Sequence, residues 1–463
     1  MRIEQLYTGC LAEAAYYIES NGEVAIIDPL RETEPYIELA TEDGAQIKYI
    51  FETHFHADFV SGHLDLAKKT GAKIIYGPGA KTNFDIYEAQ DEEIFELGEI
   101  KIKVLHTPGH TLESSCYLLI DSKGKEQALF TGDTLFIGDV GRPDLAQKGD
   151  ITTEDLAGMM YDSLHKKIFP LPDNVTIYPA HGAGSSCGKN MSSETYDTLG
   201  HQKKVNYALR AVSKEQFIKE VTEGILPPPQ YFAKNALLNK TGYDSIDQVI
   251  QEGSTSLDLD EFEAEVKKGA LILDTRHQQE FVKGFIPGSI FIGLDGMFAI
   301  WVGTLIKDIK QPIVIIAPED REEEAVLRLA RVGYDNTVGH LKGGFSTWKN
   351  ANRPVETLLS ITAAELENDT RENHITILDT RKPTEFAAGH IEGAINYPLD
   401  FINDHLEDLD KQDKYYLHCA GGYRSVIAAS IMRANGYQHV IDVQGGYAEI
   451  IKTSLTIREM ASS

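Results

Sequence analysis

The stretch Thr53-His54-Phe55-His56-Ala57-Asp58-Phe59 decides how the first half of the chain is interpreted. It follows the apolar run 47–51, which predicts a strand, so its polar side chains lie just beyond a strand end. Two histidines two positions apart, followed by an aspartate, are typical of a metal cluster. A further histidine directly after the aspartate would add a ligand for a second metal, but Phe59 stands there and cannot bind a metal. The stretch therefore favours a site for one metal.

Three later motifs supply further metal-binding side chains, and each follows a short apolar run that predicts a strand. His110 ends a Thr-Pro-Gly-His motif, Asp133 ends Thr-Gly-Asp, and His181 ends Tyr-Pro-Ala-His. Strands followed by polar loops bring such residues to one edge of their sheets. Two imidazoles, one carboxylate and open positions are the facial arrangement of non-haem iron(II) oxygenases, although a zinc hydrolase can use the same ligands.

The second half of the chain contains an internal repeat. The segment 271–276 (Leu-Ile-Leu-Asp-Thr-Arg) returns as 376–381 (Thr-Ile-Leu-Asp-Thr-Arg), 105 positions later, and a Glu-Phe pair and several glycines recur at the same offset. Two copies of one α/β domain therefore follow the first unit. Gly253-Ser254-Thr255-Ser256 predicts a linker. We expect an α/β multidomain protein with domains at 1–242, 257–355 and 360–463.

The metal motifs resemble those of metallo-β-lactamase-fold proteins of the glyoxalase II and persulfide dioxygenase branch. The resemblance spans residues 1 to about 240 and implies an αββα fold. It implies that His54, His110 and Asp133 hold a single iron, with His56, Asp58 and His181 close to the metal without binding it. Phe59 departs from the pattern of both branches, and this weakens the second-metal interpretation more than the iron interpretation.

Two further residues of this domain are candidate substrate contacts. Gly141-Arg142-Pro143-Asp144 resembles the Gly-Arg-x-Asp motif of persulfide dioxygenases. Arg142 is a candidate clamp for an anionic thiol substrate, or else a structural arginine paired with Asp139 or Asp144. Cys187 follows His181 in a loop rich in glycine and serine, where its thiol either relays sulfur near the metal or is an ordinary loop cysteine.

A cysteine in the third domain has the sequence context of a reactive thiol. Tyr415-Tyr416-Leu417-His418 predicts a buried strand, and a helix is expected from about Val426. The connecting loop, Cys419-Ala420-Gly421-Gly422-Tyr423-Arg424-Ser425, would surround the sulfur with backbone N–H groups at a helix N-terminus, which stabilises a thiolate or a bound anion. Tyrosine phosphatases have five residues between the cysteine and the arginine, whereas this loop has four.

The shorter loop suits one persulfide sulfur rather than a phosphate, as in the rhodanese sulfurtransferases that residues 360–460 resemble. The resemblance implies that Cys419 and Arg424 are catalytic and that Gly421, Gly422 and Tyr423 contact the substrate. The second domain resembles a rhodanese without its cysteine: counting back from Gly333 and Gly436 places Ile316 opposite Cys419 and Arg321 opposite Arg424. We interpret this domain as a spacer, packing or assembly domain.

Composition limits the location and the partners. The chain has 463 residues, a net charge of −27, 42% hydrophobic residues and 25% charged residues. The negative charge argues against nucleic acid or an anionic membrane as a partner. No signal peptide or transmembrane run is expected, and four scattered cysteines without a Cys-x-x-Cys motif are typical of a reducing compartment. We expect a cytoplasmic protein that forms a homo-oligomer.

The order of the three domains resembles bacterial fused persulfide dioxygenase-sulfurtransferases. This resemblance implies one Fe(II) per chain, O2-dependent oxidation of a low-molecular-weight thiol persulfide to sulfite, and transfer of sulfur from Cys419 to sulfite to give thiosulfate, a route of sulfide detoxification. The main alternative is a glyoxalase II-like zinc thioester hydrolase fused to a sulfurtransferase, which Phe59 and the rhodanese disfavour. A non-enzymatic sulfur carrier or sensor would leave the metal motifs unexplained.

Overall fold

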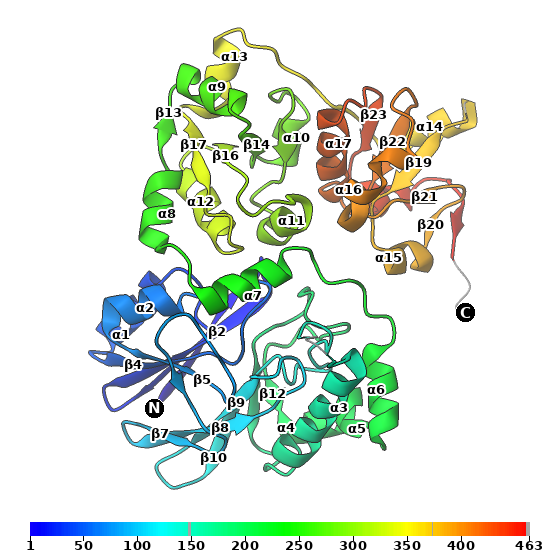
Figure 1. Cartoon of the computed structure of the whole chain (residues 1–463). Coiled ribbons are helices and arrows are strands. Elements are labelled where there is room, and N and C mark those ends of the chain that lie inside the picture. The colour runs from blue at the N-terminus through cyan, green and yellow to red at the C-terminus, as the bar shows by residue number, and fades with distance from the viewer. Residues whose placement is uncertain (147–149, 373, 460–463) are drawn as a thin grey trace. The chain divides into compact units, whose positions relative to one another are not determined.

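A computed structural model describes residues 1–146, 150–372 and 374–459. The chain divides into two compact units: residues 1–247 with 330–333, and the rest. Among the described helices, none is long and apolar enough to cross a membrane. Figure 1 labels many of the helices and strands of both units.

The first unit is built on two six-stranded sheets. The first sheet has the order β1-β2-β3-β4-β5-β6, and the second has the order β12-β11-β10-β9-β8-β7. The strands are β1 Arg2–Thr8, β2 Glu13–Ser20, β3 Glu23–Ile27, β4 Gln46–Phe51, β5 Lys73–Tyr76, β6 Tyr87–Glu88, β7 Ile94–Leu97, β8 Ile100–His106, β9 Ser115–Ile120, β10 Glu126–Gly132, β11 Thr176–Pro179 and β12 Asp197–Thr198. The predicted strand segments of this domain all fall within these strands or within one residue of them.

The two sheets pack face to face, and helices cover their outer faces. Successive residues of a strand point to opposite faces, so Tyr16 of β2 packs in a core shared with Phe130 of β10, whereas Tyr17 packs outward against Tyr36. The helices on the outer face of the first sheet are α1 Glu34–Glu42 and α2 His63–Thr70. This α/β/β/α layering confirms the predicted αββα fold.

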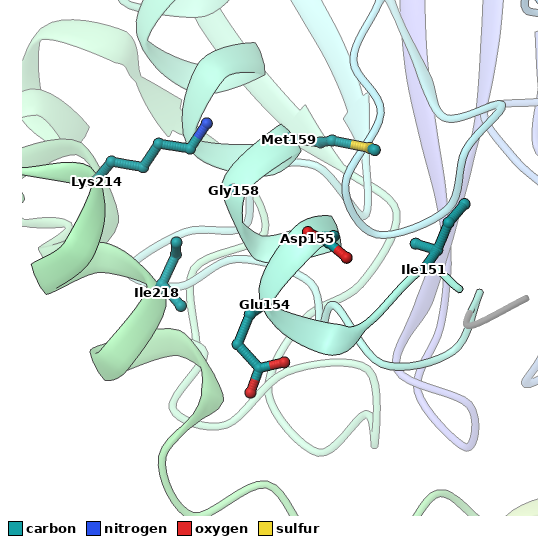
Figure 2. Close-up of a pocket in the computed structure, with 7 residues that line it drawn as sticks. All are labelled: Ile151, Glu154, Asp155, Gly158, Met159, Lys214 and Ile218. Atoms are coloured by element: carbon teal, nitrogen blue, oxygen red, sulfur yellow. The ribbon is translucent and has the colours of Figure 1, made fainter. Parts of the chain in front are cut away.

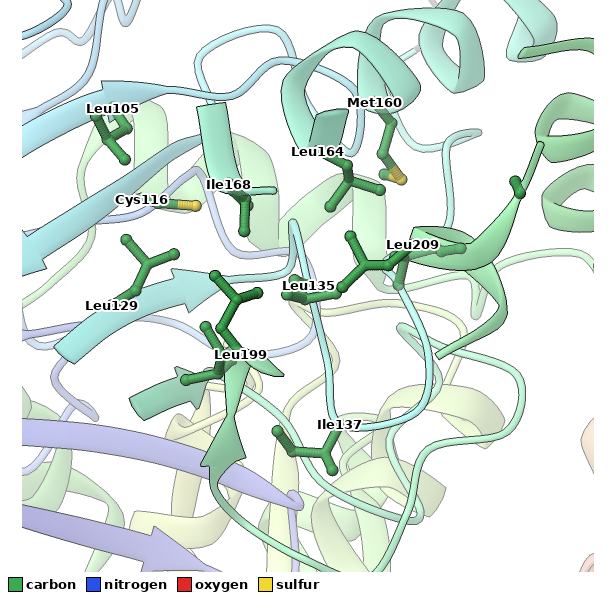
Figure 3. Packing of buried hydrophobic residues seen from close by; sticks show 14 of the residues in the cluster. Leu105, Cys116, Leu129, Leu135, Ile137, Met160, Leu164, Ile168, Leu199 and Leu209 are labelled. Carbon is green, nitrogen blue, oxygen red and sulfur yellow. The ribbon is translucent and has the colours of Figure 1, made fainter. Parts of the chain in front are cut away.

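The outer face of the second sheet has its own core. Leu105, Cys116 and Leu129 point from the strands towards Met160 and Leu164, as Figure 3 shows. The helices there are α3 Thr153–Ser163, α4 Leu199–Val205, α5 Tyr207–Arg210 and α6 Lys214–Thr222, and a π-helical turn, Leu164–Ile168, extends α3. Helices α7 Phe232–Thr241 and α8 Ile246–Gly253 follow. Four layers bury both faces of each sheet, so the polar motifs are left at the strand ends.

The second unit contains two five-stranded parallel sheets with one strand order. One sheet has the order β13-β17-β16-β14-β15, and the other has the order β18-β23-β22-β19-β21. The strands are β13 Ser256–Leu257, β14 Leu271–Asp274, β15 Ile290–Phe291, β16 Ile313–Ile316, β17 Thr337–Leu341, β18 Leu359–Ile361, β19 Thr376–Asp379, β21 Ile395–Asn396, β22 Tyr415–His418 and β23 Val440–Val443. The shared topology confirms that the sequence repeat consists of two copies of one α/β domain.

Helices connect the strands of both sheets. They are α9 Leu259–Lys267, α10 Gln278–Phe281, α11 Phe298–Leu305, α12 Glu322–Ala330 and α13 Gly344–Asn350 in the first copy, and α14 Ala363–Glu372, α15 Pro383–Ala388, α16 Ile402–His405, α17 Arg424–Ala434 and α18 Gly446–Ile450 in the second. A short antiparallel pair, β20 His390–Ile391 with β24 Ile457–Arg458, lies beside the second copy's sheet.

The segment predicted as a linker joins α8 to β13, with a turn at Ser254 and irregular backbone at Thr255. Gly253 ends α8 and Ser256 begins β13. A side chain at Gly253 would clash, since a Cβ there would lie 2.6 Å from Val326 and 3.1 Å from Thr337. The small residue at position 253 therefore serves close packing at the end of α8.

Candidate metal centre

Four strand ends bring the predicted ligands together. His54 follows β4, His110 follows β8 by four residues, Asp133 follows β10 directly, and His181 follows β11 by two residues. All four side chains are buried. The ligand atoms of His54, His110 and Asp133 lie within 4.8 Å of one another, close enough to hold one ion. This is the set that the sequence predicts for the metal.

The geometry and charge of this trio fit a cation. Nε2 of His110 lies 3.3 Å from Oδ2 of Asp133, and Nε2 of His54 lies 3.8 Å from the same oxygen. Neither carboxylate oxygen of Asp133 receives an N–H or O–H hydrogen bond from the residues the structure describes. A buried carboxylate without such bonds is costly unless a cation neutralises it. The donor set of two imidazoles and one carboxylate suits Fe(II) or Zn²⁺.

Hydrogen bonds fix the orientation of both imidazoles. The Thr53 hydroxyl donates to Oδ2 of Asp28 at 2.8 Å, so its oxygen is left to accept a bond from Nδ1–H of His54 at 2.9 Å. Nδ1 of His110 donates to the backbone carbonyl of Arg142 at 2.8 Å. Each bond leaves Nε2 free to bind a metal, as such outer hydrogen bonds do in metalloproteins. Burial and the neighbouring histidines lower the pKa of His54, so its imidazole is neutral.

A glycine makes this close approach possible. The amide of Gly141 donates to the carbonyl of Asp133 at 3.0 Å. A Cβ at Gly141 would lie 2.2 Å from that carbonyl oxygen and 2.9 Å from Nδ1 of His110. The segment Gly141–Arg142 therefore braces two ligands at once, through its own backbone.

The remaining predicted residues form a second, separate group. Ligand atoms of His56, Asp58 and His181 lie within 4.8 Å of one another. Nε2 of His181 lies 3.3 Å from Oδ2 of Asp58 and 3.5 Å from Oδ1 of Asp133, so the two groups adjoin. The buried ring of Phe59 has its centroid 4.3 Å from that of His56 and contributes no ligand.

His56 is engaged by buried carboxylates on its other side. Its Nε2 lies 3.0 Å from Oδ1 of Asp28 and 3.4 Å from Oε2 of Glu52. Burial alone would lower the pKa of His56, but Asp28 and Glu52 raise it well above its usual value. Glu52 also contacts His63, with 3.3 Å between Oε1 and Nδ1. His56 therefore belongs to a network of ion pairs behind the metal site.

Sequence reasoning did not assign roles to the supporting acids Asp28 and Glu52, or to the buried Glu13. Burial raises the pKa of Glu13 well above its usual value, so this carboxyl is neutral. A signal for Asp28 and Glu52 does exist in the sequence, because each directly follows an apolar strand, β3 or β4. Glu13 lies at the start of β2 within a run of small residues and gives no such signal.

The two substrate candidates of this domain have defined surroundings. The guanidinium of Arg142 binds both oxygens of Asp144, at 2.6 and 2.8 Å, and donates to the carbonyls of Ser186 and Leu226. Its pairing with Asp144 is the structural alternative that the sequence leaves open. Cys187 is buried, and its sulfur lies within 4.8 Å of ligand atoms of Asp133 and His181. Burial, then the nearby carboxylates, raise the pKa of the Cys187 thiol.

The loop of Cys419 lies between β22 and α17. The sulfur is buried and accepts the amide N–H of Gly422 at 3.0 Å. Gly422 has a φ of +91°, which favours glycine and allows its N–H to face the sulfur. Arg424 is held by two bonds to Glu385, at 2.7 and 2.8 Å. The Tyr423 hydroxyl donates to the Gly293 carbonyl at 2.7 Å, and Gly421 is exposed.

Strand register corrects the alignment of the two repeats. Asp274 pairs with Ile316 in one sheet, and the equivalent Asp379 pairs with His418 in the other. Ala317, not Ile316, therefore occupies the place of Cys419. The sequence count was wrong by one residue because the offset between the copies changes along the helix that follows. The conclusion that the first copy lacks the cysteine is unaffected.

A hollow of about 360 Å³ lies between α3 and α6 and is shown in Figure 2. It is lined by Ile151, Glu154, Asp155, Gly158, Met159, Lys214 and Ile218. None of these is a predicted site residue, so the hollow adds nothing to the metal centre.

The fold and the ligand trio define a metal-binding protein of the metallo-β-lactamase type, joined to two rhodanese-like domains. The Metallo-beta-lactamase superfamily matches residues 8–181, and the Rhodanese-like domain family matches residues 258–351 and 362–453. The chain belongs to the metallo-beta-lactamase superfamily and carries two rhodanese-like domains after the metal-binding one. This confirms the predicted fused architecture.

Relatives of the first domain have two different activities in their names. The chain is 35% identical over 187 residues to "Probable hydroxyacylglutathione hydrolase glo2" of Schizosaccharomyces pombe, and the match covers 40% of this chain and 68% of that protein. It is 30% identical over 210 residues to "Persulfide dioxygenase ETHE1, mitochondrial" of Homo sapiens, and the match covers 45% of this chain and 74% of that protein. The crystal structure of a metallo-beta-lactamase from Staphylococcus aureus subsp. aureus COL is 33% identical with a TM-score of 0.65, and the match covers 74% of this chain and 98% of that one.

Proposed function

We propose that the first domain is an iron-dependent persulfide dioxygenase and that the third is a rhodanese sulfurtransferase. In the first reaction one thiol persulfide, one O2 and one water give one thiol, one sulfite and two protons. In the second, sulfur carried on Cys419 passes to sulfite and gives thiosulfate. Together, the two reactions would remove sulfide by converting its sulfur into oxidised products.

The difference between the two adjoining ligand groups carries this proposal. His54, His110 and Asp133 form one group, whereas His56 lies in another and is paired with Asp28 and Glu52. The buried Phe59 supplies no ligand to the second group. Such a site favours one firmly held metal over two, and three protein ligands with open positions suit non-haem iron.

Residues of the chain hold the proposed ligands in place. Thr53 and the Arg142 carbonyl hold the two imidazoles with Nε2 inward, and the Asp133 carboxylate supplies the negative charge. Bound iron(II) would supply the O2 chemistry that protein side chains lack. Burial of all three ligands keeps bulk water from them, which protects a reactive sulfur intermediate from side reactions.

Fusion of the two activities favours the same interpretation. The product of the first reaction, sulfite, is the sulfur acceptor of the second. Linking two sites in one chain raises the effective concentration of a shared intermediate. The arrangement at Cys419 suits the second step, because the Gly422 N–H stabilises negative charge on sulfur.

A zinc thioester hydrolase of the glyoxalase II type is the second candidate. The adjoining group of His56, Asp58 and His181 favours it, because a second metal could lie there and share Asp133. The similarity to a hydroxyacylglutathione hydrolase also supports it. Phe59 and the fused rhodanese domains weigh against it.

Matched histidine variants distinguish the candidates. In protein purified without added metal, His54→Gln should lose the iron and the O2 uptake with glutathione persulfide, because it removes a ligand of the trio. His56→Gln should keep at least half of the iron, because His56 lies in the other group. Equal loss of metal from both variants, together with hydrolysis of a glutathione thioester by the wild type, would support the hydrolase instead.

A further inference from the structure

Behind the sulfur of Cys419 lies a serine that is shared with a buried carboxylate. Oγ of Ser425 is 3.7 Å from Sγ of Cys419 and 2.7 Å from Oδ1 of Asp442. Ser425 lies in the first turn of α17, and Asp442 lies on β23. All three residues are buried. A hydroxyl has one hydrogen to donate, so the sulfur and the carboxylate compete for it.

The surroundings of Asp442 make it the partner that decides this competition. Oδ2 accepts a bond from the Ser360 hydroxyl of β18 at 2.8 Å, and Oδ1 faces Ser425 of α17. On β22, the residue paired with Asp442 is Leu417, which is apolar. No ion pair reaches Asp442 from any residue the structure describes. Its charge is therefore balanced by two hydroxyl groups only.

The protonation of Asp442 sets the direction of the shared hydrogen bond. An ionised carboxylate only accepts, so Ser425 must then donate to it and turn a lone pair towards the sulfur. A protonated carboxyl can donate to Ser425, and the serine hydrogen is then free to point at the sulfur. A hydrogen bond to a charged atom is stronger than one between neutral groups, so this direction matters most when the sulfur is a thiolate.

We propose that Asp442 is a positioning residue that acts through Ser425 and controls how well the loop stabilises the Cys419 thiolate. Only the role of Asp442 in turnover rests on the proposed sulfur transfer. The inference concerns Ser425, for which no role is predicted from the sequence, and Asp442, which lies outside the loop on β23.

The thiolate is the leaving group of the transfer step. The lone pair on the sulfur of sulfite attacks the outer sulfur of the Cys419 persulfide and forms a new S–S bond. The Sγ–S bond breaks, and its electron pair stays on Sγ, so an anionic persulfide and sulfite give a thiolate and thiosulfate with no net change of charge. A hydroxyl donated to Sγ would stabilise that leaving group.

Two independent features of the molecule support the proposal. Burial raises the pKa of Asp442 to about 6, in spite of its two serine donors, so both protonation states occur near neutral pH. The other repeat offers a comparison: Ile315 pairs with His340 where Leu417 pairs with Asp442. The copy that lacks the cysteine therefore also lacks the carboxylate.

The test is the pH dependence of alkylation at Cys419 in the full-length protein. Iodoacetamide modification is followed by mass spectrometry of the Cys419 peptide, so the other cysteines do not interfere. Asp442→Asn keeps the shape but stays neutral, and its amide can donate to Ser425. We expect the pH midpoint of alkylation to fall by about one unit, the size of a hydrogen bond to a charged group. Ser360→Ala should act in the same direction, because it removes a donor that favours the ionised carboxylate.

A double variant separates the relay from simple charge. In a Ser425→Ala background, Asp442→Asn should move the midpoint by no more than about 0.3 of a pH unit, the ordinary error of additivity. An equal shift with and without Ser425 would overturn the proposal, since the effect would then be through space. Unchanged midpoints in both Asp442→Asn and Ser360→Ala would overturn it as well. This assay uses no persulfide, O2 or sulfite, so it fails or succeeds independently of the proposed function.

Discussion

Gly141→Ala is the sharpest structural test of the metal centre. The substitution adds one carbon atom, 2.2 Å from the carbonyl oxygen of Asp133 and 2.9 Å from Nδ1 of His110. Both neighbours belong to residues of the proposed ligand trio. Neither can rotate away freely, because one atom is backbone and the other belongs to a ring held by the Arg142 carbonyl.

The size of the effect follows from these distances. An ordinary contact of this kind is at least 3.4 Å long, so the backbone must separate by about 1 Å. A displacement of about 1 Å at a catalytic site costs roughly 100-fold in rate. We therefore expect Gly141→Ala to lower O2 uptake with persulfide by about 100-fold and to lower the metal content, while the chain still folds.

The assay compares metal content, O2 uptake and sulfurtransfer in one preparation. Gly9→Ala is the matched control, because a Cβ at Gly9 meets nothing within 4 Å and its backbone needs no left-handed conformation. Transfer of sulfur from thiosulfate to cyanide through Cys419 should be unchanged in both variants. If Gly141→Ala keeps the metal and the O2 uptake of the wild type, the proposed bracing of Asp133 and His110 is wrong.

Three further predictions use other sites. Asp133→Ala should abolish O2 uptake but leave sulfur transfer from thiosulfate to cyanide within about twofold, because the two sites are built from separate domains that share no residue; loss of both in a folded variant would contradict this. Cys419→Ser should change the product from thiosulfate to sulfite without stopping oxidation, since a serine hydroxyl is a poor nucleophile at neutral pH; if Cys187→Ser alone has this effect, the sulfur carrier is Cys187. Because the pKa of Asp442 is raised to about 6, the stability contributed by its neutral form is present at low pH and lost as the pH rises through about 6. From about pH 4 to pH 8 the free energy of unfolding of the wild type should therefore fall by up to about 3 kcal/mol relative to that of Asp442→Asn. The urea dependence of Cys419 labelling measures both free energies, and parallel pH profiles of the two proteins would refute this prediction.

The cluster of metal-binding side chains could be predicted from sequence because each motif follows a strand, whereas the choice of His54, His110 and Asp133 among them came from the resemblance to persulfide dioxygenases. Strand ends are local features, and parallel or sandwiched strands bring them to a common edge whatever the loops do. The repeat was visible for a similar reason: the strands β14 and β19 and their aspartates are equivalent, and they recur at one unchanged spacing.

The remaining features depend on contacts between distant segments. The pairing of His56 with Asp28 and Glu52 joins residues from two strand ends, and no motif encodes it. The Asp442–Ser425 bond joins a strand and a helix in the same way. The one-residue error at Ala317 arose because sequence offsets were counted across a helix of different length, whereas strand register settles the match.

Metal analysis of protein purified without added metal, combined with O2 uptake on a persulfide, tests the central claim most directly. The account predicts one iron per chain, held by His54, His110 and Asp133, and consumption of O2 with formation of sulfite or thiosulfate. Two tightly bound zinc ions per chain, with thioester hydrolysis and no O2 consumption, would contradict it.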